Sequence, residues 1–186
     1  MMKRVDPNKA YRLLEAGPVV LVATAMAGHR NIMTMGFHMV IQHDPPLLGC
    51  IIGPWDHSHA ALKRTKECVI AIPTVDLAET VVDIGNCSGS SVDKFRRFGL
   101  TAIDAAKVGA PLIGECLANL ECRMVDDRLS DAYALHVLEV VAIHYDERRP
   151  EKRTLHHNGD GTFTVDGEVI DLRGRMTRWK DFQVEL

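Results

Sequence analysis

The first fifty residues contain three apolar segments that are separated only by short turns. Val19 to Ala25 is rich in β-branched residues, Gly28 to Asn31 predicts a turn, and Ile32 to Gln42 resumes the apolar pattern. A Pro-Pro pair ends that segment, and Leu47 to Ile52 predicts a third strand. Connections this short cannot hold a crossover helix, so the three strands are expected to pair antiparallel, as in a meander.

Further strands are predicted in the rest of the chain. Cys68 to Ile72 is a short apolar run that a proline ends. Pro111 to Val125 and Tyr133 to His144 predict two long strands, and long twisted hairpins of this kind close small barrels. An Asn-Gly-Asp-Gly turn precedes Thr162 to Val165, and a second turn separates that strand from Val169 to Leu172.

Short helices are predicted between these strands. A first helix is expected within residues 1–17, where a Gly-Pro pair stops it. Ser58 opens a second helix, and Leu77 to Ile84 forms a third. Ser90 to Asp93 has a capping-box pattern, which predicts a fourth helix that ends at Gly99. The whole is a mainly β protein, a β-barrel with inserted helices.

Composition and charge exclude several classes of protein. The 186 residues, 46% hydrophobic and 25% charged, are typical of a single domain, which we expect to span 1–186. No apolar run approaches the roughly 20 residues that cross a bilayer. The N-terminus lacks the apolar stretch of a secretion signal, so we expect a cytoplasmic protein with no membrane partner. With a net charge of −3 and scattered basic residues, nucleic-acid binding is not expected either.

The common catalytic motifs are missing from the sequence. The dinucleotide-binding and phosphate-binding glycine loops are absent, as are the serine nucleophile elbow and the zinc-protease motif. None of the five cysteines forms a Cys-x-x-Cys pair. His57 and His59 lack a convincing third ligand nearby, so we predict no metal site.

Three segments combine polar groups in ways that suggest a ligand. Asn31 to Phe37 places amide, hydroxyl and thioether groups on one strand, which could also be an ordinary strand with a bulge at its glycine. Pro54 to His59 leads into a helix start, where free N–H groups suit a phosphate or a simple cap. Asn86 to Phe95 places hydroxyls before a helix and Lys94 in its first turn. A cation at that helix end is favourable when a phosphate lies nearby, although a capped surface helix with an exposed lysine is the simpler alternative.

Taken together, these segments resemble the flavin reductase-like proteins, and within them the flavoredoxin type. The resemblance covers roughly residues 8–145 and is most specific at NIMT and in SGSSVDKFRRFGLT. It implies a Greek-key-like split β-barrel with short peripheral helices that binds FMN. It matches only loosely after Arg148, so we expect residues 150–186 to form a divergent extension that packs on the barrel.

The resemblance also implies a role for individual residues. Asn31 would place its amide against the flavin, and residues 33–35 would line the isoalloxazine ring. Ser58 and Lys94 would bind the phosphate. The complete predicted FMN site consists of Asn31, Met33, Thr34, Met35, Phe37, His57, Ser58, Ser88, Gly89, Lys94, Tyr133 and Trp179.

Four positions depart from the family pattern. Asp56 stands where relatives often carry arginine, which removes positive charge near the phosphate. Phe37 stands where relatives commonly have tryptophan, and Tyr133 where they often have histidine. Trp179 lies in a tail unlike the family's usual ending, where it would either cover the flavin or anchor the tail.

The resemblance implies an oxidoreductase. Hydride would pass from NADH or NADPH to FMN and then to free flavin, ferric iron or another acceptor, with no catalytic side chain required. Relatives are homodimers with flavin sites at the subunit interface, so a homodimer is expected here. Two alternatives stay open: an electron carrier reduced by a partner protein, and a non-catalytic ligand-binding barrel that has lost flavin.

Overall fold

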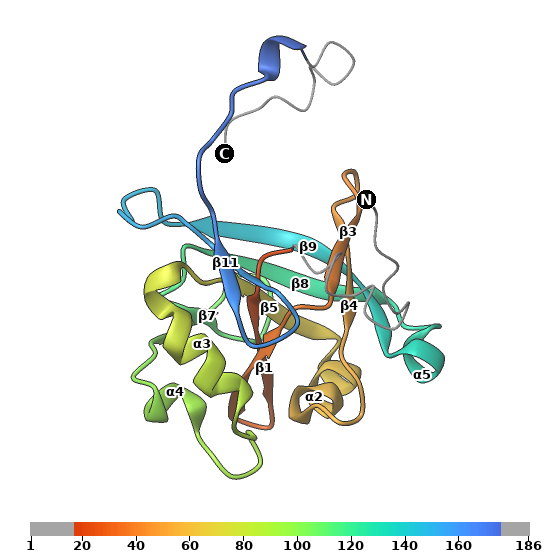
Figure 1. The fold of residues 1–186 in the computed structure, drawn as a ribbon. Helices are drawn as coiled ribbons and strands as arrows, with labels where there is room; N and C mark the ends of the chain where they lie inside the picture. The colour runs from red at the N-terminus through yellow and green to blue at the C-terminus, as the bar shows by residue number, and fades with distance from the viewer. Residues whose placement is uncertain (1–16, 176–186) are drawn as a thin grey trace.

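The computed structural model describes residues 17–175, and a seven-stranded antiparallel sheet forms its centre (Figure 1). The order across the sheet is β2-β1-β5-β8-β9-β4-β3. These strands are β1 (Val20–Met26), β2 (His29–Met35), β3 (His38–Gln42), β4 (Leu47–Ile51), β5 (Glu67–Ile72), β8 (Ala118–Asp126) and β9 (Leu135–Tyr145). Two small two-stranded sheets are added by β6 (Ala102–Ile103) with β7 (Leu112–Ile113), and by β10 (Leu155–His157) with β11 (Phe163–Val165).

The sheet must curl because its two edge strands are consecutive in sequence. β2 and β3 lie at opposite ends of the strand order, yet only Gly36 and Phe37 connect them. Two residues reach less than about 10 Å, so the edges approach each other as in a barrel. The β3–β4 hairpin pairs with β9, which gives the Greek-key-like arrangement. The predicted mainly β barrel is therefore confirmed.

Short helices lie between the strands, as predicted. They are α2 (His57–Thr65), a 3-10 turn η2 (Val75–Leu77), α3 (Ala78–Gly85), α4 (Lys94–Arg97), α5 (Ser130–Tyr133) and a second 3-10 turn η3 (Arg173–Arg175). α3 and α4 lie together on one side of the sheet, and α2 covers another part of it (Figure 1). The helix expected within residues 1–17 lies outside the described residues, apart from Gly17.

Both faces of β1 are buried, which explains its continuous apolar sequence. Leu21 and Ala23 belong to the core cluster beneath α3 and α4, which also contains Ile84. The alternate residues Val20 and Val22 point into a second cluster that draws on β2, β4, β8 and β9, and so fills the barrel. Strands buried on both faces lose the polar alternation of a half-exposed strand.

Four predictions about the strands and their connections were wrong in detail. Ile32 to Gln42 is not one strand, because the chain leaves β2 after Met35 to reach the other edge of the sheet. β2 therefore pairs with β1 alone, and the predicted three-strand meander is two separate hairpins. Within the predicted turn from Gly28 to Asn31, β2 already begins at His29. The predicted strand from Pro111 to Val125 is divided between β7 and β8.

Three further predictions need correction. Asp93 alone caps α4, since its side chain accepts a hydrogen bond from the Arg96 amide, so the predicted capping box begins too early. Gly99 does adopt the expected positive φ, 64°. Tyr133 ends α5 instead of starting the following strand. Val169 to Leu172 forms no strand, because nothing pairs with its backbone in the described part of the chain.

The first part of the segment after residue 150 packs on the barrel. The Leu155 carbonyl accepts a 2.7 Å hydrogen bond from the Val19 amide, and Leu155 itself is buried in the cluster beneath α3. Phe163 and Val165 pack against the same cluster. Between β11 and Arg175, the last described residue, the chain extends away from the barrel (Figure 1), and Val169 is 92% exposed.

Candidate functional site

A loop, a strand and a helix meet closely around Asn31. The Asn31 side chain is buried on β2, and its Nδ2 donates to Ser58 Oγ at 2.8 Å. Thr24 Oγ1 donates to the same hydroxyl at 3.3 Å. Gly89 lies so near that a Cβ atom on it would come within 2.1 Å of Asn31 Oδ1 and 2.6 Å of the His57 ring. Only glycine allows the loop this approach.

The oxygen of the Asn31 amide has no partner among the described residues. Oδ1 is buried and accepts no hydrogen bond there. Reversing the amide would merely exchange an unpaired oxygen for an unpaired N–H, because Ser58 can serve either group. A buried polar atom without a partner is costly, on the order of 1–3 kcal/mol, unless a ligand or water satisfies it. The site is thus chemically incomplete at this atom.

Lys94 brings a buried positive charge to the same region. It is 4% exposed, and its Nζ donates to the Ile84 carbonyl at 2.9 Å. Within residues 17–175 it forms no ion pair. Burial lowers the pKa of Lys94, because the charged form loses contact with water. The nearby Cys87 side chain offsets only part of this decrease. An anionic ligand group would stabilise this ammonium.

Two adjoining hollows, which we call together the inner groove, pass beside these groups. The first, about 280 Å³, has Asn31, His57 and Lys94 on its wall. The second, about 290 Å³, continues along β2 to Phe37. They share four lining residues: Met33, Thr34, Trp55 and Asp56. The groove therefore has a polar, cationic end and an end lined by thioether and aromatic side chains.

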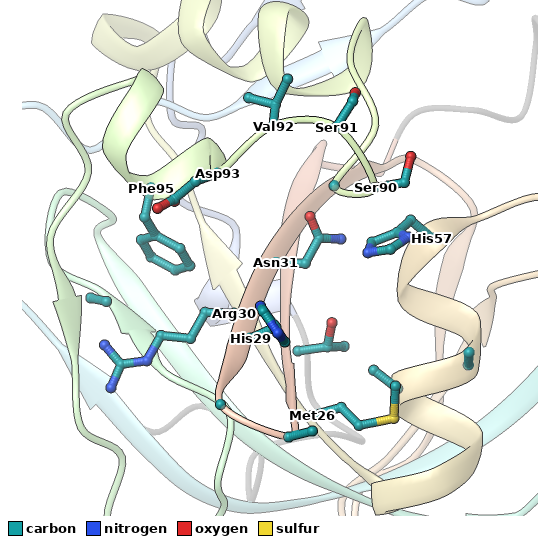
Figure 2. A pocket seen from close by; sticks show the side chains of 17 residues that line it. Met26, His29, Arg30, Asn31, His57, Ser90, Ser91, Val92, Asp93 and Phe95 are labelled. Atoms are coloured by element: carbon teal, nitrogen blue, oxygen red, sulfur yellow. The ribbon is translucent and has the colours of Figure 1, made fainter.

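A larger hollow, the outer pocket, also has Asn31 on its wall (Figure 2). Its volume is about 740 Å³, and it lies between the β1–β2 hairpin, α2 and the loop that carries Ser90. It shares Asn31, His57 and Gly89 with the inner groove. Although it is the larger of the two, it lacks Lys94 and the Met33 to Phe37 segment, which the sequence predicted as parts of the cofactor site.

Most of the predicted site residues come together in the inner groove. Ser58 does not line the groove. Its fully buried hydroxyl instead accepts a hydrogen bond from the Asn31 amide. Tyr133 is 68% exposed on α5 and lines none of these hollows. Trp179 lies outside the described residues. The predicted residues that line the inner groove are Asn31, Met33, Thr34, Met35, Phe37, His57, Ser88, Gly89 and Lys94.

Two lining residues, Trp55 and Asp56, were not among the predicted binding residues, although the sequence had placed Asp56 near the phosphate. Trp55 stands 74% exposed between the two hollows and lies against Gly53, where a Cβ would meet its ring at 2.3 Å. Asp56 also lines both hollows, and its carboxylate accepts from the Gly53 amide at 2.9 Å. Both residues belong to the Pro54 to His59 segment, which the sequence analysis had singled out. The tryptophan in that loop was the sequence feature that could have indicated a lining residue.

Two other properties concern metals and membranes. Among residues 17–175, no group of three or more His, Cys, Asp or Glu side chains is arranged to hold a metal ion. Over the same residues, every helix is too short or too polar to cross a membrane.

Comparisons with known proteins identify the family of this chain. The model of the flavin reductase-like domain matches residues 12–164. An uncharacterized protein of Archaeoglobus fulgidus is 35% identical over 113 residues, which are 61% of this chain and 64% of that protein, so the match spans less than two thirds of the relative's length.

Solved structures extend the similarity to three dimensions. An FMN-binding domain of a flavin reductase-like enzyme from Shewanella baltica has a TM-score of 0.76 at 25% identity, covering 90% of this chain and 95% of that one. The flavoredoxin of Desulfovibrio vulgaris also has a TM-score of 0.76, at 20% identity, covering 83% and 88%, which supports the shared fold. The chain therefore belongs to the flavin reductase-like domain family and has its split β-barrel fold.

Proposed function

We propose that this chain binds FMN in the inner groove and works as an oxidoreductase that passes electrons from NADH or NADPH, through FMN, to free flavin, ferric iron or another acceptor. The observation that carries the proposal is the buried Lys94 ammonium, which has a carbonyl but no counter-charge within residues 17–175. A phosphate is the group of FMN that would stabilise it. The relative from Shewanella baltica is described as FMN-binding, in agreement with this assignment.

The residues on the wall of the groove fit the two parts of FMN. Lys94 and Ser88 would hold the phosphate, while Asn31 Oδ1 would accept from a donor on the cofactor. At the other end, Met33 and Phe37 offer apolar surface for the ring. Thr34 is held in place by a 2.6 Å hydrogen bond from its hydroxyl to the Val81 carbonyl.

The chain's own residues need only bind FMN, orient its ring and shield it from water. When bound, FMN would supply the redox chemistry, since a flavin can take a hydride from a nicotinamide and give up electrons to an acceptor. The protein contributes by fixing the ring against β2 and by leaving room for a second ring beside it. Trp55, exposed at the mouth of the groove, is placed to limit water there. No side chain is assigned as a general acid or base.

A homodimer forms part of the proposal. β3 is an edge strand whose Met39, Val40 and Ile41 are 52%, 67% and 46% exposed. An exposed apolar edge strand favours association with another surface. Phe37, which lines the groove, directly precedes this strand and is 57% exposed, so a partner seated on β3 would also cover the open end of the groove.

Purification and anaerobic mixing test the proposal. We expect the protein, saturated with FMN, to show flavin absorbance after removal of free ligand and to sediment as a dimer. Anaerobic NADH or NADPH should then bleach the flavin at catalytic rates. Bleaching only with a reduced partner protein would favour the electron carrier. Failure to retain or titrate FMN at all would contradict the proposed function.

A further inference from the structure

One cysteine differs from the others in its surroundings. Cys87 is half-buried and lines the inner groove, within reach of a small molecule that enters there. The remaining cysteines are buried in the core, and they are Cys50, Cys68, Cys116 and Cys122. Burial raises the pKa of the Cys50 and Cys116 thiols to about 12, which makes them poor nucleophiles. Cys87 is therefore the thiol that a dissolved reagent can reach in the folded chain.

The Cys87 thiol and the Lys94 ammonium contact the same backbone oxygen. Cys87 Sγ lies 3.8 Å from the Ile84 carbonyl oxygen, and Lys94 Nζ donates to that oxygen at 2.9 Å. An ammonium beside a cysteine stabilises the thiolate, which is the form that attacks disulfides. Lys94 is buried and has no ion pair within residues 17–175, so no carboxylate described there competes with the thiolate.

The hollow beside Cys87 also carries an unsatisfied acceptor. Asn31 Oδ1 is buried and has no hydrogen-bond partner among the described residues, and Asn31 lines the same hollow of about 280 Å³ as Cys87 and Lys94. Asp56 brings a carboxylate to this wall, where it accepts from the Gly53 amide at 2.9 Å. A peptide N–H is a donor that suits Asn31, and a carboxylate is a partner that suits Lys94. The hollow thus fits a small anionic peptide.

We propose that Cys87, assisted by the Lys94 ammonium, forms a mixed disulfide with a small anionic peptide thiol of the glutathione class, which then occupies the inner groove in place of FMN. The Cys87 thiolate attacks one sulfur of glutathione disulfide, the bond between the two glutathione sulfurs breaks, and the second glutathione leaves as a thiolate. The Cys87 sulfur is oxidised, the departing sulfur is reduced, and the thiol proton of Cys87 passes to water. The competition with FMN rests on the proposed function, whereas the modification of Cys87 does not.

Mass spectrometry of the full chain, freed of flavin and treated with glutathione disulfide, tests the modification. We expect a single adduct, on the peptide that contains Cys87. Cys87→Ser should abolish this adduct, whereas Cys116→Ala, which removes a buried thiol, should leave it in place. Lys94→Met should slow the reaction about threefold to tenfold, because it removes the charge that stabilises the thiolate.

A flavin titration tests the competition. Saturating FMN should slow formation of the adduct at least about tenfold. The protein that carries the adduct should bind FMN at least about tenfold more weakly than the same sample after reduction with dithiothreitol. In Cys87→Ser, treatment with glutathione disulfide should leave FMN affinity as it was before treatment, whatever that affinity is.

The outcomes separate this modification from the proposed function. An adduct on Cys87 in a protein that never binds FMN would support the modification site and contradict the flavin site. FMN binding without any adduct on Cys87, or equal FMN affinity with and without the adduct, would overturn the proposal. An unchanged reaction rate in Lys94→Met would also overturn it, because the thiol would then react without help from the neighbouring charge.

Discussion

Among residues 17–175, two side chains of the lysine, arginine, aspartate and glutamate types are buried, Lys94 and Glu121. The groups that surround them differ sharply. Glu121, on β8, accepts from the backbone amides of residues 106–108 and from His144 Nε2 at 2.6 Å. Burial would raise the pKa of Glu121, but these four donors together lower it. Lys94 has a single carbonyl and no counter-charge there, and burial lowers its pKa. One charge is satisfied by the fold, whereas the other is left for a ligand.

Removing the satisfied charge should produce the largest loss of stability. Glu121→Gln places an amide N–H₂ among donors, so we expect the free energy of unfolding to fall by about 3 kcal/mol. Chemical denaturation measures it. Glu115→Gln is the matched control, because Glu115 also accepts from a backbone amide, that of Thr101, but in a partly exposed position. If Glu121→Gln lowers the free energy of unfolding no more than Glu115→Gln does, the contrast between Glu121 and Lys94 fails.

A buried neutral group provides a second contrast, through pH. His136 is fully buried, its Nε2 lies 2.9 Å from the Ile52 carbonyl, and its Nδ1 is unpaired within the described chain. Burial is the main cause that lowers the pKa of His136. The unfolded histidine then takes up a proton first, so stability is full above about pH 6.5 and falls as the pH drops below it, by at most about 2 kcal/mol at pH 5.

Denaturation at pH 7 and pH 5 checks this dependence. His136→Gln should reduce the fall in unfolding free energy between the two pH values, and this difference is the readout whatever the absolute stability of the variant. An unchanged difference between pH 7 and pH 5 in the variant would assign the acid sensitivity to other groups.

Adding a side chain at Gly89, where the loop contacts Asn31, should weaken binding at the proposed FMN site. Gly89→Ala forces the loop or the Asn31 side chain to move, because the new Cβ would lie 2.1 Å from Asn31 Oδ1. We expect FMN affinity to fall about tenfold, roughly 1.4 kcal/mol. Gly167→Ala adds a methyl group where nothing lies within 4 Å and serves as the control. Equal FMN affinity in the two variants would remove the Gly89 approach from the site.

The smallest effect is expected for the stability of the ligand-free protein when Lys94 is replaced. Lys94→Met keeps the side-chain length and removes an uncompensated buried charge. Such replacements are often neutral or stabilising, so the unfolding free energy should stay within about 1 kcal/mol or rise. Thermal unfolding without flavin measures it. A loss as large as that of Glu121→Gln would mean that Lys94 is a structural residue.

Local patterns in the sequence predicted most single elements of the fold. β1, β4 and β5 are continuous apolar runs bounded by turns, and α2 begins one residue before the expected Ser58. The Asn31, Thr34 and Lys94 positions in the groove followed from the family resemblance, because their motifs are local and specific.

What depends on the closure of the barrel could not be predicted from local sequence. The chain breaks between β2 and β3 because these consecutive strands lie at opposite edges of the sheet. The local pattern of apolar residues gives no sign of such a break. Ser58 was expected to touch the cofactor, yet it supports Asn31, a difference set by the depth of α2 in the fold. The outer pocket likewise arises only where the Ser90 loop crosses the β1–β2 hairpin.

The most direct measurement compares FMN with riboflavin, which lacks the phosphate, in the wild-type protein and in Lys94→Met. If Lys94 compensates the phosphate, the wild-type protein should prefer FMN by about 10- to 100-fold, and the variant should lose most of that preference while its riboflavin affinity is unchanged. The same FMN-to-riboflavin ratio in both proteins would contradict the account.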